Sequence, residues 1–592
     1  MANNISSNHT ISSKDNIISR IYGAFRGVDF RGEEINITRS PDSLNVWKDY
    51  KETESIRTRP DIELLNAFSG TIYGIFFYDN TMLVHSGKTL YKVVNGVPTE
   101  LYTGLNEIAS NGFVYESVWY FKDGKNYLKY DGTTIKEVAD DAYVPTTSIG
   151  RKPASGGTTY EDANFLTGMR RNTFLRDGAG TEFWLDSKNI DTDYEPVVEM
   201  ISTKTAEYVP VTDEYTIDYT KGKIIFEQAP VLDNGSLVPL TDGQDDLRVT
   251  FRKTISGYKD TILNCTMLQV FDNRVFFSGN PKYPNVVYHC SLNDPSYCSD
   301  LDYYREGLDD AEVKGLVAGN NALWVFREPS DANTTVFYHT PTFDSEYGKI
   351  YPSTHSSIST GCIGKAINFN DDIVFFSDRG MEGISGDVTT EQTLGHRSTL
   401  VDRKLIAEPN YKNMILEEWE GYLLVFIDNK VYLADSRTAF TNENHIEYDW
   451  FYWELDKNIT YAKVNNGILY LGTEDGIYTM TTETDENGFY IPRADVESYW
   501  VTPKDKFKYP HKLKTTNKRG CVVEATGDIA VYAKIEDTDF ELIGEYNNIT
   551  DAFVSRIKRK KFKDIQLKFY SKTRFSLETA TLECFIGGYI KR

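Results

Sequence analysis

The sequence predicts an all-β protein: a β-propeller of six or seven blades with an inserted β-sandwich and a C-terminal β-sandwich. Three observations lead to this fold class. Tyr (40), Phe (32) and Gly (42) are abundant, as expected for strands joined by tight turns. No stretch shows a long apolar period of about 3.6 residues, so helices are not expected. Finally, one hairpin pattern recurs seven times along the chain, which indicates a repeat architecture.

Each copy of the pattern is a short apolar or aromatic strand, a tight polar turn and a second aromatic strand. The turns contain pairs such as Asp-Asn, Asn-Asn and Asn-Gly, residues that tolerate the left-handed backbone of two-residue hairpin turns. The copies occupy residues 76–87, 113–124, 270–280, 317–328, 368–380, 418–429 and 463–476.

The spacing of these hairpins predicts blades of four strands. With one turn residue taken as the marker of each copy, the successive spacings are 37, 156, 48, 51, 49 and 46 residues. A period of roughly 40–50 residues is typical of propellers. The spacing of 156 predicts a blade followed by an inserted domain. The markers are Asn80, Ser117, Asn273, Asn321, Asp372, Gly421 and Gly467.

The N-terminal part precedes the first repeat. Residues 1–16 lack the apolar core of a signal peptide and are expected to form a flexible tail. Residues 17–150 are expected to be the first part of the propeller. Within them, LNVWKDY (44–50) and SIRTRPD (55–61) are predicted to pair as a hairpin. This segment is expected to supply strands to the last blade and so close the ring of blades.

The insertion is assigned to residues 151–255. A stretch rich in Pro, Gly, Ser and Thr (144–162) reads as a linker. Alternating strands follow at 181–186, 215–219, 222–227 and 247–253, and their number predicts a small β-sandwich. The second part of the propeller is placed at 256–490. Segments that alternate with period two then predict the C-terminal sandwich at 491–592.

The charge is acidic overall, with 87 Asp and Glu against 64 Lys and Arg and a formal net charge of −23. This balance argues against a protein that holds nucleic acid by neutralising phosphates. Two basic islands stand out, at 504–514 and 555–564. They read either as solvated strand faces or as docking sites for an acidic neighbouring subunit. The candidate docking residues are Lys504, Lys506, Lys508, Lys512, Lys514, Lys558, Arg559, Lys560 and Lys561.

The search for chemistry gives no catalytic, cofactor or metal site, so a non-enzymatic protein without cofactors is expected. The eight histidines are scattered without a metal-binding spacing. Acidic runs at 191–193 and 242–246 lack the ligand spacing of a calcium loop. No nucleophile elbow or phosphate-binding glycine loop occurs. The six cysteines form no CxxC pair and are expected to be free buried thiols. No apolar stretch is long enough to span a membrane.

A family resemblance covers nearly the whole chain. Its pieces, in order, are FRGVDF to SIRTRP (25–60), RRNTFLRDGAGTEFWL with YTIDYTKGKIIFEQAP in the insertion, the blade at 273–300, and the stretch from SYWVTPKDKFKYPHKLK to the closing GGYIKR. These pieces resemble bacteriophage tail stabilisation and nozzle proteins. The resemblance implies a virion protein with a propeller body, arranged as a ring of subunits below the portal, without enzymatic residues.

The expected function is therefore structural: a nozzle or ring protein of a phage tail that forms part of the DNA ejection channel and docks other tail proteins. Expected partners are further copies in a hexameric or dodecameric ring, the portal or adaptor and other tail proteins, and genomic double-stranded DNA in transit without specific binding. An acidic lumen would repel the duplex. The expected location is the virion tail, after assembly in the host cytoplasm.

Two alternatives stay open. The first is a receptor- or carbohydrate-binding propeller at the tail tip, for which exposed tryptophans would be the evidence. The segment WFYWEL (450–455) reads either as such a platform or as a strand of the core. The second is a glycan-degrading enzyme, because propeller glycosidases work with paired carboxylates on blade loops and Asp and Glu are abundant here.

Overall fold

The computed structural model describes residues 17–32, 35–49, 54–154, 156–239, 241–332, 334–345, 348–386, 388–442, 445–486, 488–491, 495–558 and 560–589. The expected flexible tail, residues 1–16, lies outside the described residues. The chain divides into two compact units. Unit 1 combines Met1–Glu100 with Ser357–Arg592, and unit 2 is Leu101–Ser356.

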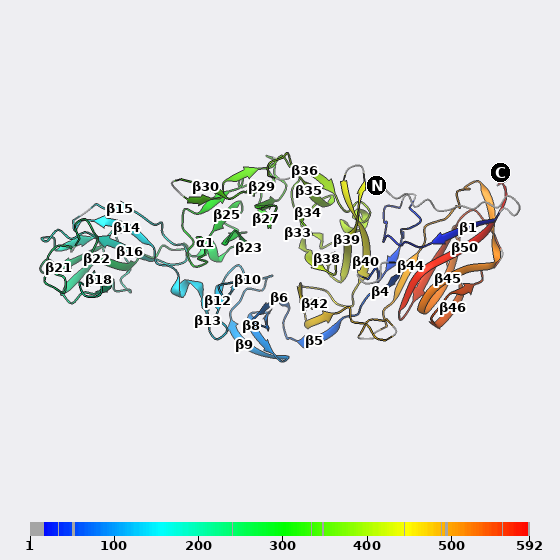
Figure 1. Cartoon of the computed structure of the whole chain (residues 1–592), viewed down its shortest axis with the longest axis horizontal. Coiled ribbons are helices and arrows are strands. Elements are labelled where there is room, and N and C mark those ends of the chain that lie inside the picture. Colours follow the sequence, from blue (N-terminus) through cyan, green and yellow to red (C-terminus); the bar gives the residue numbers. More distant parts are fainter. Residues whose placement is uncertain are drawn as a thin grey trace. The chain divides into compact units, whose positions relative to one another are not determined.

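The regular secondary structure of the described residues is almost entirely β, and seven of the sheets have four antiparallel strands. Each of these sheets has the form of a propeller blade (Figure 1), and the all-β propeller fold class is confirmed. Helical structure is limited to single turns: α1 (Asp260–Leu263), α2 (Asp402–Leu405) and two 3₁₀ turns, Val138–Asp141 and Tyr411–Asn413.

Unit 1 holds four blades. The first is β6 (Ile72–Tyr78), β7 (Thr81–Ser86), β8 (Thr89–Val94) and β9 (Val97–Thr103), and the boundary between the units falls within β9. The next two are β33 (Ala366–Phe369), β34 (Asp372–Ser377), β35 (Gly380–Ser385) and β36 (Thr393–His396), then β37 (Ile415–Trp419), β38 (Tyr422–Ile427), β39 (Lys430–Asn442) and β40 (His445–Glu454). The fourth is β41 (Tyr461–Asn465), β42 (Ile468–Gly472), β43 (Gly476–Met480) and β5 (Glu63–Ala67).

Unit 2 holds three blades. They are β10 (Asn111–Tyr115), β11 (Val118–Lys122), β12 (Tyr127–Tyr130) and β13 (Ile135–Glu137); β23 (Met267–Phe271), β24 (Arg274–Ser278), β25 (Val286–His289) and β26 (Tyr303–Arg305); and β27 (Val313–Gly319), β28 (Ala322–Arg327), β29 (Val336–His339) and β32 (Ser353–His355). The third carries a two-stranded hairpin, β30 (Thr342–Asp344) and β31 (Gly348–Ile350), between its last two strands.

The seven predicted hairpins are the first two strands of the seven blades, and each turn has two residues. Both residues of every turn lie at positive φ, for example Asp79 at 45° and Asn80 at 57°. This backbone matches the right-handed twist of the flanking strands. The fifth turn is Asn370–Asp371, one residue before the marker Asp372, which already belongs to β34.

The last blade takes its outer strand from the N-terminal part of the chain. β5 pairs with β43 in antiparallel register, with Ala67 opposite Gly476. The segment before the first repeat thus supplies a strand to the last blade, as the sequence predicted. Gly476 sits where an added Cβ would meet the backbone of Asn66 and Ala67, so this strand pair requires a glycine there.

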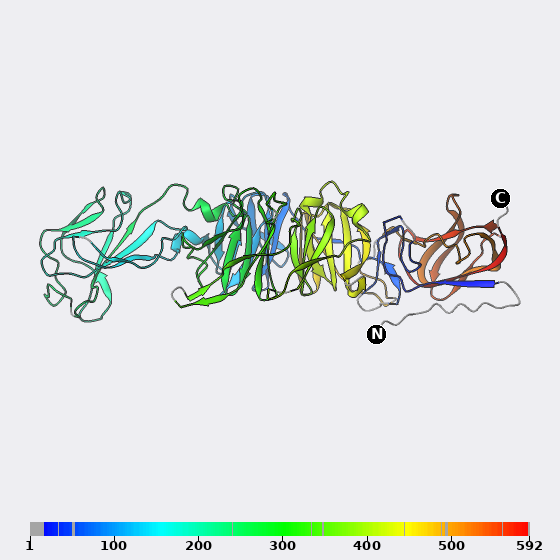
Figure 2. The ribbon, with the colours of Figure 1, turned by 90° about the horizontal axis from the view of Figure 1, so that it is seen from above.

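The preceding segment differs from the prediction. Residues 17–58 were expected to open the propeller, but their strands belong to the C-terminal sheet: β1 (Ile17–Tyr22) and β4 (Ile56–Thr58) pair with β50 (Phe575–Tyr589), and β2 (Ser43–Leu44) pairs with β44 (Ser498–Val501). Figure 2 shows β1, in blue, beside the orange and red C-terminal strands. The predicted hairpin itself is present as β3 (Val46–Trp47) and β4.

The C-terminal sheet has eleven strands among the described residues. Besides the strands already named, it contains β45 (Lys512–Ile535), β46 (Glu541–Ile549), β47 (Phe553–Ser555), β48 (Lys561–Phe562) and β49 (Ile565–Ser571). Its apolar core continues into the blades of unit 1 through Trp47, whose ring stacks on Trp419 with centroids 5.5 Å apart and meets Trp453 edge-on at 5.3 Å.

The insertion consists of two sheets packed on one apolar core. The larger sheet contains β14 (Thr146–Arg151), β15 (Thr158–Thr159), β16 (Met169–Phe174), β18 (Val197–Ile201), β19 (Tyr208–Pro210) and β22 (Leu247–Arg252). The smaller contains β17 (Glu182–Trp184), β20 (Tyr215–Asp218) and β21 (Lys223–Phe226). Phe174, Phe183 and Phe226 are fully buried between the sheets. The first strand starts at Thr146, before the expected boundary at 151.

Candidate docking surfaces

The first basic island borders a cleft of about 790 Å³ in unit 1. We call it the basic cleft. Its polar walls come from the loop 503–510 and from β1, which contributes Arg20. The island therefore lies at an accessible hollow rather than on a flat strand face. The lining residues are Arg20, Gly32, Ile35, Ile37, Pro41, Pro503, Lys504, Asp505, Lys506, Lys508, Pro510 and Gln566.

Two buried side chains fix the shape of this loop. Asp505 accepts hydrogen bonds from the guanidinium of Arg20 (Nε, 2.6 Å), the hydroxyl of Tyr22 (3.1 Å) and the backbone N–H of Phe507 (2.6 Å). Phe507 is 1% exposed and packs in the apolar core. Because both residues point inward, the alternate residues Lys506 and Lys508 are left on the outer side.

The cleft carries more cationic than anionic groups. Arg20 is neutralised by Asp505, and the exposed Lys504 pairs with Asp537 at 2.9 Å. Among the described residues, Lys506 and Lys508 have no carboxylate partner. In a chain of net charge −23, a hollow with two unpaired ammonium groups is suited to a carboxylate-rich partner.

The other lysines of the first island have structural contacts. Lys512 opens β45, and its ammonium lies 5.1 Å from the ring centre of Tyr509. Lys514 is buried and donates hydrogen bonds to the carbonyl oxygens of Tyr509 and Lys563, both at 2.6 Å. Burial lowers the pKa of Lys514. Its position indicates a role in holding β45 to its neighbours rather than in docking.

The second island borders a smaller hollow of about 190 Å³, which we call the basic groove. Its lining combines five apolar residues with the cations of Arg556, Lys558 and Lys560, and also includes Thr538 and Glu541. Leu542 of β46 is 53% exposed beside it. Among the residues that the structure describes, Arg556 and Lys558 form no ion pair, whereas Lys560 pairs with Glu541 at 3.1 Å. The five apolar residues are Ala533, Ile535, Leu542, Ile543 and Ile557.

The remaining candidates of the second island do not line the groove. Lys561 is exposed in β48, opposite Thr515 of β45. Arg559 lies outside the described residues. The sequence pattern missed Arg20, which lies 485 positions before its partner Asp505. Arg556 belongs to the second island at 555–564 but was not among the candidate docking residues, and it lines the basic groove.

The insertion presents a third surface, a long loop between β21 and β22. We call residues 227–239 and 241–246 the acidic loop, because they contain Glu227, Asp233, Asp242, Asp245 and Asp246 and no basic residue. Ordered loops of this length without secondary structure are uncommon and are often functional. The acidic run at 242–246 within this loop lacks the ligand spacing of a calcium loop.

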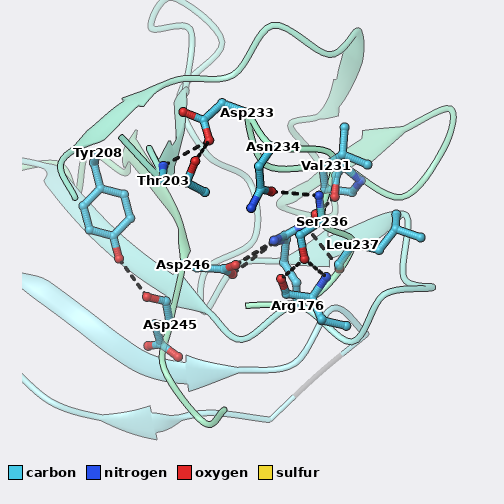
Figure 3. Close-up of polar contacts among 12 residues, drawn as sticks. Arg176, Thr203, Tyr208, Val231, Asp233, Asn234, Ser236, Leu237, Asp245 and Asp246 are labelled. Atoms are coloured by element: carbon cyan, nitrogen blue, oxygen red, sulfur yellow. Dashed lines mark hydrogen bonds and ion pairs between the residues drawn. The ribbon is translucent and has the colours of Figure 1, made fainter. Parts of the chain in front are cut away.

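Internal hydrogen bonds give the acidic loop a defined shape (Figure 3). Arg176 is buried and donates from Nη1 to the carbonyl oxygens of Pro230 (2.5 Å), Ser236 and Leu237 (both 3.3 Å). Its other side forms an ion pair with Asp246 at 2.7 Å. Asp233 accepts from the backbone N–H of Thr203 at 3.0 Å, which ties the loop to the turn after β18.

This scaffold leaves apolar side chains on the outside of the loop. Val231, Leu237 and Val238 are 39%, 45% and 50% exposed, while Leu232 between them is turned into the core. Glu227 and Asp242 are exposed, and neither forms an ion pair within the described part of the chain. The acidic loop thus combines exposed apolar groups with unpaired carboxylates.

The possible aromatic platform at 450–455 is part of the core. Trp450, Phe451, Tyr452 and Trp453 are all at most 1% exposed. Trp450 donates its indole N–H to the carbonyl oxygen of Arg397 at 3.0 Å. The segment forms most of β40, so it offers no surface to a sugar ring.

One polar cluster, around His396, resembles a catalytic triad in composition but not in its hydrogen bonds. His396 lies between Glu382 (3.1 Å) and Asp402 (2.6 Å), while the Ser398 hydroxyl donates to Asp402 rather than to the imidazole. A catalytic triad requires the serine to contact the histidine.

No group of three or more His, Cys, Asp or Glu that could hold a metal occurs among the described residues. The six cysteines are free and buried. No helix of the described residues is long and apolar enough to cross a membrane.

Comparison with known proteins gives fold neighbours alone. No family model and no curated protein matches the sequence. BamB from Moraxella catarrhalis aligns at 10% identity and a TM-score of 0.28, over 76% of this chain and 94% of that protein. PorZ from Porphyromonas gingivalis aligns at 12% and 0.26, over 84% and 75%. Hsv2 from Kluyveromyces lactis aligns at 8% and 0.24, over 65% and 97%. These values carry no argument about activity, ligand or partner.

Proposed function

We propose that this chain is a structural subunit of a bacteriophage tail, a nozzle or ring protein below the portal that forms part of the DNA ejection channel and docks other tail proteins. The observation that carries the proposal is the basic cleft. Its unpaired Lys506 and Lys508 lie on a loop that the buried residues Asp505 and Phe507 hold in place. An anchored cationic loop on an acidic protein is a preorganised docking site.

The backbone of this loop supports the proposal. Phe507 and Lys508 lie at φ values of 53° and 62°, in the left-handed region that bulky residues rarely adopt. Such conformations cost of order 1–3 kcal/mol and persist where the surroundings enforce them, often at binding sites. Here the buried ring of Phe507 and the hydrogen bond from its N–H to Asp505 hold the turn in place.

The rest of the architecture suits an assembly subunit. Within each unit the blades pack face to face on apolar cores, one example in each unit, and such packing makes a blade array stiff. The insertion and the C-terminal sheet add surfaces beyond the blades, and each carries an unpaired charged hollow or loop. The sequence resembles phage tail nozzle proteins along nearly the whole chain. For this reason we assign these surfaces to contacts with other proteins of a phage tail.

Electron microscopy of the purified full-length chain tests the proposal. We expect closed rings of identical subunits, and we expect phage particles made without this chain to incorporate it when it is added. A chain that stays monomeric at all concentrations and is not taken up by such particles would overturn the proposal. Turnover of a host glycan by the purified chain would also overturn it in favour of an enzyme.

A further inference from the structure

Two surfaces of this chain are complementary in both charge and polarity. The acidic loop of the insertion contains exposed apolar side chains and, at positions before and after them in the sequence, the exposed carboxylates of Glu227 and Asp242, which form no ion pair within the described residues. The basic groove of the C-terminal sheet combines apolar residues with the cations of Arg556 and Lys558, which form no ion pair within the described residues either. Surfaces that match in this way favour one partner and penalise others through charge repulsion.

We infer that the acidic loop of one copy docks in the basic groove of the next copy. This inference rests on the proposed ring and names the contact that builds it. The two surfaces are different parts of the same chain, so the contact is heterologous. Repeated contacts of this kind close into a ring when the rotation between copies is a simple fraction of a turn.

Both the acidic loop and the basic groove have a fixed shape before they meet. The acidic loop is held by the buried Arg176, so Leu237 and Val238 are displayed without further ordering. The groove lies beside β46, which pairs on one side with β45. Leu542 is exposed at that place. Preorganised surfaces bind with a smaller entropic cost than disordered segments.

The occupant of the groove follows from charge. The cations of the groove would repel a basic segment. A purely polar segment would leave the apolar residues of the groove in contact with water. The acidic loop satisfies both requirements, because it has five carboxylates and no Lys or Arg, and its exposed residues include Val231, Leu237 and Val238. Asp246 is already neutralised by Arg176, so the free carboxylates at the surface belong to residues such as Glu227 and Asp242.

A charge-swap experiment on the full-length chain tests the inference. The groove variant is Arg556→Glu with Lys558→Glu, and the loop variant is Glu227→Lys with Asp242→Lys. We expect each variant to weaken self-association by roughly tenfold or more in sedimentation velocity, and we expect the combined four-residue variant to recover most of the lost affinity. The control for the groove variant is Lys412→Glu with Lys572→Glu, which makes the same change in net charge as that variant at exposed positions outside both surfaces.

The outcomes separate this inference from the proposed function. Loss in both variants without recovery in the combined variant would mean that the two surfaces do not meet, and it would overturn the inference. Rings that form equally well in all variants would also overturn it and would leave the proposed function intact. Leu237→Ser and Leu542→Ser provide a second, uncharged test; both should weaken self-association, and unchanged association in both would contradict the contact. Circular dichroism melting of each variant confirms that it is folded.

Discussion

Arg176 and Asp246 form a buried ion pair in the insertion: Nη2 lies 2.7 Å from Oδ2, and the two side chains are 2% and 4% exposed. Arg176 follows β16 and Asp246 precedes β22, so the pair joins the ends of two adjacent strands of the larger sheet. The same guanidinium holds three carbonyl oxygens of the acidic loop. One side chain therefore links the core of the domain to the surface that we assign to subunit contact.

Replacing Arg176 with Met should destabilise the insertion strongly, because it leaves the carboxylate of Asp246 buried without a partner. The expected loss in free energy of unfolding is about 3–5 kcal/mol. Urea unfolding measures this loss, and hydrogen exchange should show faster exchange within the acidic loop. The control is Lys221→Met, which removes an exposed pair with Asp218 at 3.7 Å and should cost at most about 1 kcal/mol. Equal effects of the two variants would contradict the role given to Arg176.

A matched pair of glycines tests how the N-terminal segment is held. Gly27 and Gly96 both have φ of 77°, but a Cβ on Gly27 would overlap the carbonyl oxygen of Trp450, while a Cβ on Gly96 would meet open space. Gly96→Ala should therefore cost only the conformational penalty of roughly 1–2 kcal/mol.

Gly27→Ala should cost clearly more, because the chain must move away from β40 and lose the hydrogen bond from the N–H of Val28 to the Trp450 oxygen (2.7 Å). Urea unfolding of the two variants gives the comparison directly. A similar loss of stability in both would show that the close approach to Trp450 does not hold this segment.

The blades were predictable because their signal is local. Pairs such as Asp272-Asn273 and Asn466-Gly467 adopt positive φ between two strands, and that preference is visible in two adjacent letters of the sequence. The pairing of β1 with β50 was not predictable in this way, because Ile17 lies opposite Phe585 and no local pattern encodes so distant a partner.

The two basic islands were predictable in part, because a run of lysines is also a local signal in the sequence. The runs of lysine marked both basic islands, but lysine count did not distinguish Lys506, which faces the cleft, from Lys514, whose ammonium is buried among carbonyl oxygens. The difference between these two lysines depends on which side chains of the segment point into the core. The sequence showed the acidic run at 242–246 but not that the acidic loop as a whole forms one shaped surface, because that shape depends on Arg176, more than fifty residues earlier in the chain.

His396 should make the stability of unit 1 depend on pH. Burial alone would lower its pKa, but the hydrogen bonds and charges of Asp402 and Glu382 outweigh burial and raise the pKa to about 9. The unfolded value is about 6.5. The stabilisation is therefore complete below about pH 6.5, and it is lost as pH rises through 9.

The protonation of His396 contributes at most about 3 kcal/mol to the free energy of unfolding. Urea unfolding at several pH values between 6 and 9.5 should show the decline in the native chain, and His396→Gln should flatten it. Asp402→Asn removes one of the two partners and should reduce the slope without abolishing it. A decline of equal size in His396→Gln would assign the pH dependence to other groups.

Charge reversal in the basic cleft should separate docking from ring formation. Lys506→Glu with Lys508→Glu replaces two unpaired ammonium groups by carboxylates at a hollow that we assign to other tail proteins. We expect uptake of this variant into particles that lack the chain to fall sharply, because like charges would now face each other across the contact. Self-association should stay at the native level, since the basic groove and the acidic loop are untouched.

Lys504 provides the control for this experiment. It borders the same cleft but already pairs with Asp537 at 2.9 Å on the exposed surface, so Lys504→Gln should have a much smaller effect on uptake. Raising the salt concentration should weaken uptake of the native chain, because exposed charges are screened over a Debye length of about 10 Å at 0.1 M. Uptake that is insensitive to both salt and the double reversal would remove the basic cleft from the docking surface. Loss of ring formation in the double variant would instead place the cleft in the contact between identical subunits.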